Sequence, residues 1–134
     1  MSEKISTKLP VILLGVIIVV ASFLMIGVAR QESAIMDELA HIPAGYGYVK
    51  YFDFRLNPEH PPLLKALAAL TLLTMDLNFP TTHRSWTTDI NGQWEVGAKF
   101  LYESGNDADK IVFVSRIIPI LFTFEFMLFS SSNS

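Results

Sequence analysis

The chain has 134 residues, of which 51% are hydrophobic, and its formal net charge is −3. Its mean hydropathy of +0.39 is high for a water-soluble domain. The absence of cysteine excludes disulfides and cysteine metal sites, and the basic residues do not cluster, so nothing favours nucleic acid as a partner.

The first predicted element is a membrane-spanning helix over residues 9–29, a run without a charged side chain. At about 1.5 Å per residue, a helix of this length crosses a hydrocarbon core of roughly 30 Å. Lys4 and Lys8 precede the run, so the positive-inside rule places residues 1–8 in the cytoplasm. A cleaved signal peptide is the alternative, but its apolar region is usually shorter and residues 27–29 match a cleavage site only weakly. A retained span is therefore predicted.

Residues 30–109 form a polar but aromatic-rich segment, which we expect to be an external loop. Ser33 is a suitable N-cap for a helix over about 34–51. Asp37 then lies in or near the first turn of that helix, where the helix dipole favours an anion. Pro43 should kink the helix or convert it to a turn. The aromatic residues that follow are typical of a membrane interface.

An extended corner at residues 57–62 leads into an apolar helix over 63–75, because residues before prolines avoid the α region. Pro62 suits the first turn of that helix. At about 20 Å the helix is short for a membrane span. We predict a juxtamembrane, interfacial helix, which keeps all of 30–109 on one side; a second crossing is the alternative. A further helix is expected near 94–102.

Residues 110–129 are predicted to form a second, imperfect membrane-spanning helix, followed by a polar tail at 130–134. The helix contains Arg116 and Glu125, and charged side chains within a bilayer usually face a protein interior or a wet cavity. A single helix cannot provide such an interior. The fold class is therefore an all-α integral membrane protein that belongs to a larger bundle, with further transmembrane helices and membrane lipid as its partners.

Asp37 is a candidate general base. A partly desolvated carboxylate at a membrane surface can take a proton from an acceptor hydroxyl, although a solvated residue at a helix N-terminus is the simpler explanation. The adjacent Glu38 points to another face of the helix. His41 lies four positions after Asp37 on the same face, where it could orient the carboxylate or help hold a metal. Because the spacing fixes no further ligand, no metal and no cofactor are predicted.

Three cationic side chains are candidates for binding a phosphate: His60, Lys65 and Arg116. The helix that begins near residue 63 adds an N-terminus, which also attracts anions. Each residue has a simpler explanation as well. His60 could be a turn residue, while Lys65 and Arg116 could extend from apolar helices to the membrane surface.

Together these residues resemble the N-terminal part of a GT-C glycosyltransferase of the protein O-mannosyltransferase type. Those membrane enzymes carry Asp-Glu in the first external loop, which Asp37-Glu38 matches, and a His-Pro-Pro-Leu-x-Lys motif, which residues 60–65 match. An arginine early in the next span is matched by Arg116. The string from Asp37 to Pro62 is also similar to bacterial polyprenyl-phosphate-sugar transferases. The resemblance covers about residues 10–125.

The resemblance implies transfer of a sugar from a polyprenyl-phosphate donor to an acceptor hydroxyl at the external face of the inner or plasma membrane, with inversion. Asp37 would be the base and Glu38 would position the base or the acceptor. His60, Lys65 and Arg116 would lie near the donor phosphate, with His41 beside them. Family enzymes have many spans, so this chain would be an incomplete GT-C bundle, inactive alone. A small non-enzymatic membrane anchor or partner subunit is the alternative class.

Overall fold

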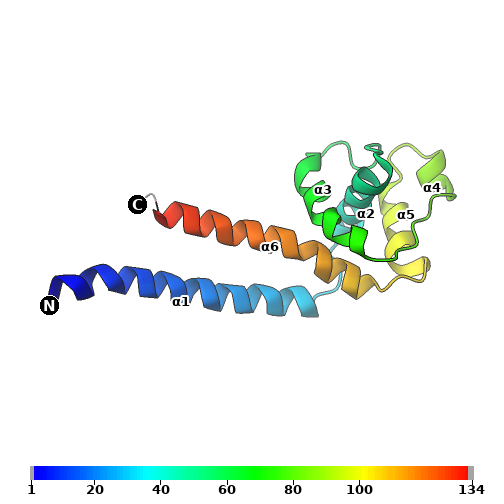
Figure 1. Cartoon of the computed structure of the whole chain (residues 1–134). Helices are drawn as coiled ribbons and strands as arrows, with labels where there is room; N and C mark the ends of the chain where they lie inside the picture. The colour runs from blue at the N-terminus through cyan, green and yellow to red at the C-terminus, as the bar shows by residue number, and fades with distance from the viewer. Residues whose placement is uncertain (1, 133–134) are drawn as a thin grey trace.

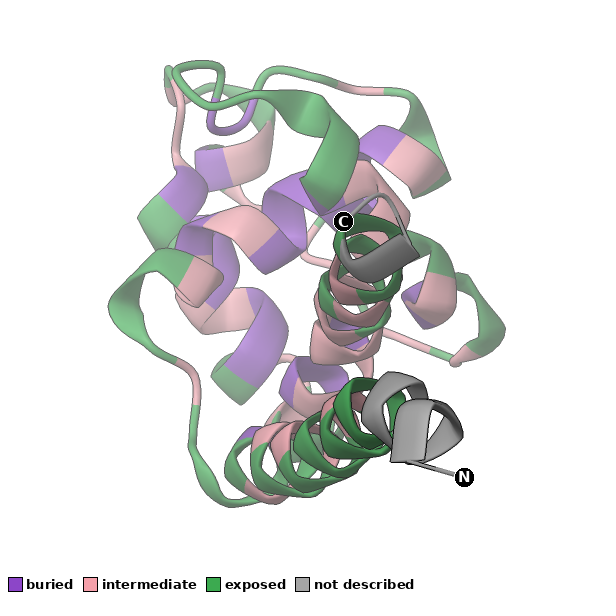
Figure 2. Cartoon of the chain, turned by 90° about the vertical axis from the view of Figure 1, so that its left-hand side faces the viewer, coloured by how far each residue is buried: buried purple, intermediate pink, exposed green. Residues whose placement is uncertain are grey.

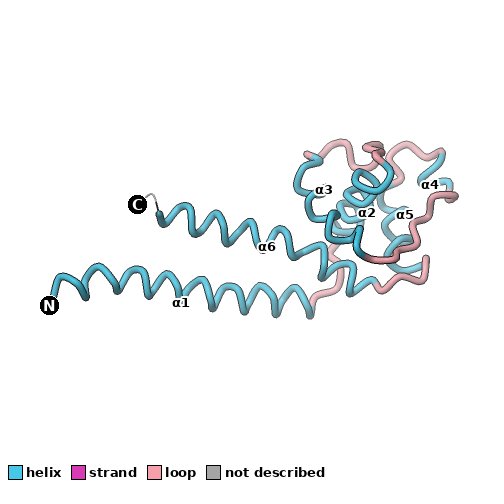
Figure 3. The backbone as a smooth tube through the Cα atoms, in the orientation of Figure 1, coloured by secondary structure: helices cyan, strands magenta, loops and turns pink. Residues whose placement is uncertain are grey.

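The computed structural model describes the backbone of residues 2–132 and the side chains of residues 9–130. Over these residues the regular secondary structure is all helical, joined by loops and without a strand, which confirms the all-α prediction (Figure 3). The elements are α1 (Ser2–Gln31), α2 (Met36–Tyr51), α3 (Pro62–Leu70), a 3₁₀ turn (Thr71–Thr74), α4 (Arg84–Thr87), α5 (Gln93–Ala98), a π-helical segment (Lys99–Glu103) and α6 (Ala108–Ser132). The predicted polar tail is helical as far as Ser132, and residues 133–134 lie outside the described part.

Two long helices project from one side of a helical head, which consists of α2 to α5 and their connecting loops (Figure 1). Helices α1 and α6 run antiparallel, so the start of α1 and the end of α6 both lie far from the head. The segments Leu9–Gln31 and Ala108–Ser130 are long and apolar enough to cross a membrane, with mean hydropathies of 3.1 and 2.0. They correspond to the predicted spans at 9–29 and 110–129.

Helix α1 is almost bare of protein contacts along its length. Within its described side chains Ala29 alone is buried, at the end that meets the head. Among the described side chains of α1 (residues 9–31), the one hydroxyl group is that of Ser22, and it donates a hydrogen bond of 2.7 Å to the carbonyl of Ile18, one turn earlier in the same helix. The hydroxyl group of Ser22 is therefore satisfied within the helix and needs no partner in an apolar environment.

Most of the buried residues lie in the head and in the first turns of α6, whereas the long helices are mostly intermediate or exposed (Figure 2). A carbon at the Cβ position of Gly45 would collide with the carbonyl of Lys65, and one at Gly97 would collide with the carbonyl of Leu39. The two glycines therefore let the backbones of α3 and α5 pack directly on α2. The largest buried side chains fill the remaining space: Tyr46, Phe100, Leu72, Leu101, Ile111, Val96 and Val112.

The start and the middle of α2 both differ from expectation. The N-cap is Ile35 and not Ser33, because the carboxylate of Glu38 reaches back and accepts a hydrogen bond from the Ile35 N–H at 3.0 Å. Pro43 lies inside the helix without ending it. A proline lacks the N–H that would bond to the carbonyl four residues earlier, which here is that of Leu39. That carbonyl faces the closely packed Gly97.

The apolar helix expected at 63–75 is α3 followed by the 3₁₀ turn, with Pro62 in its first turn. The turn packs on α6, where the hydroxyl of Thr71 donates to the carbonyl of Val114 at 3.3 Å. Helix α3 lies at the edge of the head from which the long helices project (Figure 1). Leu63 and Leu70 on this helix are 70% and 49% exposed. The helix expected near 94–102 is α5 with the π-helical segment.

Candidate functional site

A cavity of about 410 Å³ lies where α2, α3, α6 and the corner before α3 meet. Its wall is mainly apolar and includes Ile42, Leu64, Ala68, Leu72 and Pro119. Its polar lining includes five of the six predicted site residues: Glu38, His41, His60, Lys65 and Arg116. The fold therefore brings together residues that are far apart in the chain. Asp37 does not line the cavity.

Arg116 is fully engaged by hydrogen bonds. Its Nε and Nη2 donate to the two carboxylate oxygens of Glu38, each at 2.7 Å. Its remaining N–H groups donate to the carbonyls of Ala29 at 3.1 Å, Glu32 at 2.8 Å and Ser33 at 3.1 Å. A guanidinium has five N–H donors, so all are used. Since carbonyls at a helix end have no partner within the helix, Arg116 joins the end of α1 to the start of α2.

Lys65 is 8% exposed and is equally engaged. Its ammonium group donates to the backbone carbonyl and side-chain oxygen of Asn57, at 2.9 and 2.5 Å, and to the carbonyl of His60 at 3.0 Å. It also lies 5.2 Å from the ring centroid of Tyr48. Burial lowers the pKa of Lys65. The lysine therefore holds the corner in place, and its predicted contact with a phosphate would require some of these bonds to break.

The sequence analysis missed the polar network that fixes the other side of this corner. Asn57 has a left-handed backbone with φ of 52°, which asparagine tolerates better than most residues. Its side chain donates to Gln93 at 2.6 Å, and Gln93 donates to Glu59 at 2.8 Å. Gln93 lies 36 residues after Asn57, so no local sequence pattern predicts this contact.

His41 and His60 are the polar cavity residues whose side chains have no hydrogen-bond partner among the described residues. Their ring centroids lie 5.1 Å apart in an edge-to-face arrangement. Within the described residues, neither ring takes part in a hydrogen bond or an ion pair. Burial lowers the pKa of His41, and the neighbouring charges of Lys65 and His60 lower it further. These two imidazoles are therefore available to a ligand.

Asp37 lies in the first turn of α2 and is exposed. Its carboxylate makes no hydrogen bond or ion pair with residues 9–130, but its charge acts on His41 and favours the protonated imidazole. Asp37 is therefore accessible from solvent, close to His41 of the cavity lining. The described residues contain no group of three or more His, Asp or Glu side chains placed to hold a metal ion.

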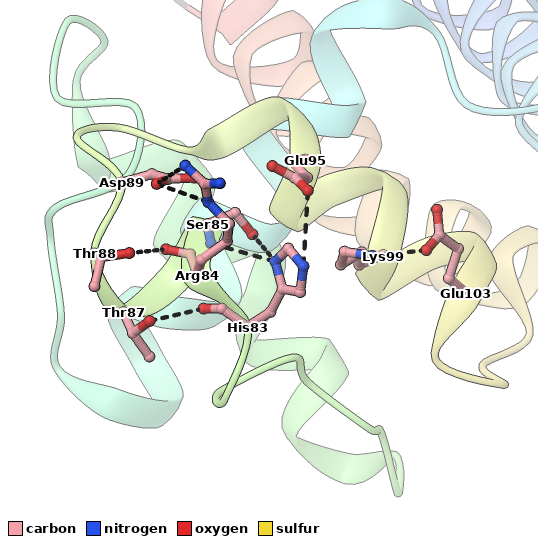
Figure 4. Close-up of polar contacts among 9 residues, drawn as sticks. All are labelled: His83, Arg84, Ser85, Thr87, Thr88, Asp89, Glu95, Lys99 and Glu103. Atoms are coloured by element: carbon pink, nitrogen blue, oxygen red, sulfur yellow. Dashed lines mark hydrogen bonds and ion pairs between the residues drawn. The ribbon is translucent and has the colours of Figure 1, made fainter.

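A second polar cluster, at the start of α4, places a serine, an imidazole and a carboxylate in a row (Figure 4). The hydroxyl of Ser85 lies 2.8 Å from Nδ1 of His83, and Nε2 of His83 lies 3.7 Å from Glu95. Ser85 is completely buried, so no substrate can reach its hydroxyl. His83 also accepts a hydrogen bond from the Ser85 N–H and is the N-cap of α4. The cluster is structural.

The fold and the cavity define an all-helical protein with two helices of membrane-spanning length and a mainly apolar cavity between its head and α6. No protein-family model, curated protein or solved structure matches the chain. The chemistry of the cavity is therefore the basis for a functional proposal.

Proposed function

We propose that this chain is the N-terminal part of a membrane glycosyltransferase that moves a sugar from a polyprenyl-phosphate donor to an acceptor hydroxyl at the external face of the plasma membrane. Further transmembrane helices would complete the enzyme, and the chain alone would be inactive. The observation that carries the proposal is the cavity of about 410 Å³, whose mainly apolar lining includes two imidazoles without a hydrogen-bond partner among the described residues, one of which, His41, is close enough to Asp37 to feel its charge.

In this proposal the cavity binds the donor by its two chemically different parts. The isoprenoid chain packs on the apolar wall formed by Leu64, Ala68 and Leu72. The phosphate lies among the polar residues of the lining, beside His41 and His60. Such a division suits a ligand with one charged group on a long hydrocarbon chain, because each part meets surroundings of its own polarity.

The reaction would be a single displacement at the anomeric carbon. The acceptor oxygen forms a bond to that carbon while the bond to the donor phosphate breaks, and the phosphate leaves with the electron pair. Asp37 takes the proton from the acceptor hydroxyl. Glu38, paired with Arg116, fixes the first turn of α2 and so positions Asp37.

The corresponding topology places α1 and α6 across the membrane and the head outside. Lys4 and Lys8 then lie in the cytoplasm, as the positive-inside rule favours. Helix α3 lies on the membrane surface, with Leu63 and Leu70 directed to the lipid. The bare apolar surfaces of α1 and α6 would be covered by lipid and by further helices.

A non-enzymatic membrane anchor or partner subunit is the second candidate. One specific observation favours it: the side chains of Lys65 and Arg116 donate their hydrogen bonds to other groups of the protein. An anchor needs the bare helices α1 and α6 but no ligand in the cavity. Donor binding therefore discriminates between the two candidates.

The first test measures donor binding by the full chain in lipid nanodiscs, by displacement of a fluorescent polyprenyl-phosphate-hexose analogue. We expect binding by the wild type and by Asp37→Asn, and loss of binding in Ala68→Trp, which fills the cavity. Absence of specific binding by the wild type would reject the transferase proposal and favour the anchor.

The second test measures sugar transfer in membranes of cells that naturally produce the chain and supply the further helices. Because general base catalysis contributes about 10²–10⁴-fold, Asp37→Asn should reduce transfer by at least about a hundredfold. Asp76→Asn, at another exposed aspartate, is the matched control and should retain transfer. Unchanged transfer by Asp37→Asn would exclude Asp37 as the base.

A further inference from the structure

The positive charges that line the cavity are not equally available to an anion. All five N–H groups of Arg116 donate to Glu38 and to three backbone carbonyls. Lys65 donates three hydrogen bonds to Asn57 and His60, the full number that an ammonium group can make. An incoming phosphate therefore finds no free donor on either residue.

The two imidazoles are the remaining source of donors in the cavity lining. His41 and His60 lie edge to face with ring centroids 5.1 Å apart, close enough for one anion to contact both rings. A neutral imidazole carries one N–H, whereas a protonated imidazole carries two and a positive charge. Charge-assisted hydrogen bonds are roughly twice as strong as neutral ones, so protonation markedly favours an anion between the rings.

We infer that the cavity binds the phosphodiester of a polyprenyl-phosphate-sugar donor through a protonated imidazole of the His41–His60 pair. This inference rests on the proposed function. Donor binding is then coupled to the uptake of a proton. The site is a proton-linked anion site, in contrast to a permanent lysine or arginine clamp, and it binds the donor more tightly as the pH falls.

The charged groups around the pair determine the direction of this coupling. On α2, Asp37 favours protonation of His41, and so does Glu59 from the corner. Lys65 on α3 and the neighbouring His60 oppose it, and the charge of Glu38 is matched by Arg116 on α6. In the free protein burial and these cations lower the pKa of His41. A bound anion stabilises the protonated form, so it raises that pKa and binding weakens as the pH rises through the histidine range.

The experiment measures binding of a fluorescent short-chain polyprenyl phosphodiester of a hexose to the full chain in nanodiscs. A phosphodiester keeps one negative charge throughout the histidine range, so only the protein titrates. As the pH falls from about 8 to about 5.5, the range over which histidine changes charge, we expect the affinity to rise severalfold, toward the limit of about tenfold that one unit of pKa difference between the free and bound states would set.

Three variants separate the pair from other sources of pH dependence. The double variant His41→Gln/His60→Gln should bind weakly at both pH values. His83→Gln removes the remaining histidine of the chain, outside the cavity, and should behave as the wild type. His60→Lys supplies a permanent positive charge and should bind at both pH values, which keeps the test decisive if the double variant folds poorly. Thermal unfolding followed by tryptophan fluorescence checks the fold of each variant.

Each outcome bears on one claim. Tight binding by the wild type with the same affinity at both pH values would overturn the proton-linked site and leave the proposed function standing. No binding at either pH would overturn both. A phosphatidylglycerol analogue bound as tightly as the polyprenyl probe would overturn the polyprenyl donor as the ligand. Dimethyl phosphate, which lacks a hydrocarbon chain, should compete only weakly.

Discussion

At the scale of single residues, Arg116 determines the geometry of the site more than any other side chain. Its guanidinium group joins three separate elements: the end of α1, the first turn of α2 and the middle of α6. The carboxylate of Glu38 is held on one side by Arg116 and on the other by the N–H of Ile35. The position of Asp37, next to Glu38, therefore depends on a contact that spans 78 residues of sequence.

Arg116→Lys should loosen this junction. A lysine cannot make two parallel hydrogen bonds to Glu38 and reach three carbonyls as well, so we expect a loss of about 2 kcal/mol in the free energy of unfolding of the head. Trypsin cleavage after Arg30 should become faster, because the adjoining linker is less tightly held. Both are measured on the chain in nanodiscs.

The matched control for this prediction is Arg55→Lys. Arg55 pairs with Asp53 at 2.7 Å, but its side chain is 55% exposed, and exposed pairs contribute less than about 1 kcal/mol. Equal stability and equal cleavage in the two variants would show that Arg116 does not hold the junction.

At the scale of elements, α2 is the axis of the head because small residues let its neighbours approach its backbone. Gly97→Ala should be destabilising by about 1–3 kcal/mol, since the added methyl group collides with the carbonyl of Leu39 and packed backbones move little. The midpoint of thermal unfolding, followed by tryptophan fluorescence, measures the effect.

Gly27→Ala in α1 is the control for this substitution. No atom lies within 4 Å of the added carbon, and alanine is a better helix former than glycine by about 1 kcal/mol. This variant should therefore be as stable as the wild type or slightly more stable. A Gly97→Ala variant that matched it would contradict the close packing of α5 on α2.

The sequence predicts those elements that depend on local pattern. Long apolar runs and proline positions are sufficient for the long helices and for the start of α3. The N-cap of α2 could not be predicted, because Glu38, which accepts the N–H of Ile35, is also held by Arg116 from 78 residues away. The contact between the Leu39 carbonyl, which Pro43 leaves without its usual helical donor, and Gly97 likewise joins residues that are distant in sequence.

The composition of the candidate site was partly predictable for the same reason. The sequence motifs single out five residues that line one cavity: Glu38, His41, His60, Lys65 and Arg116. The motifs do not reveal which of them are already engaged within the protein. That distinction depends on tertiary contacts.

At the scale of the whole molecule, the antiparallel arrangement of α1 and α6 places the head at one end of the helix pair, beside the first turns of α6 (Figure 1). In the proposed topology all of residues 30–109 therefore lies outside the cell. The apolar α3 would then rest on the membrane surface without crossing it.

Cysteine labelling tests this topology directly, because the native sequence has no cysteine. Ser33→Cys and Ser104→Cys should both react with a membrane-impermeant maleimide added to intact cells. Ser6→Cys should react only after the membrane is permeabilised. Labelling of only one of the two head positions from outside would show that α3 crosses the membrane.

The internal hydrogen bond of Ser22 in α1 has a consequence for how freely this helix can change. The Ser22 hydroxyl group needs no neighbouring helix as a partner. Most of the other described side chains of α1 are exposed aliphatic groups. One aliphatic residue can therefore replace another in this segment with little effect. Its length is a stricter requirement in a bilayer, since deleting a single turn removes about 5.4 Å and would pull Asp37 toward the lipid.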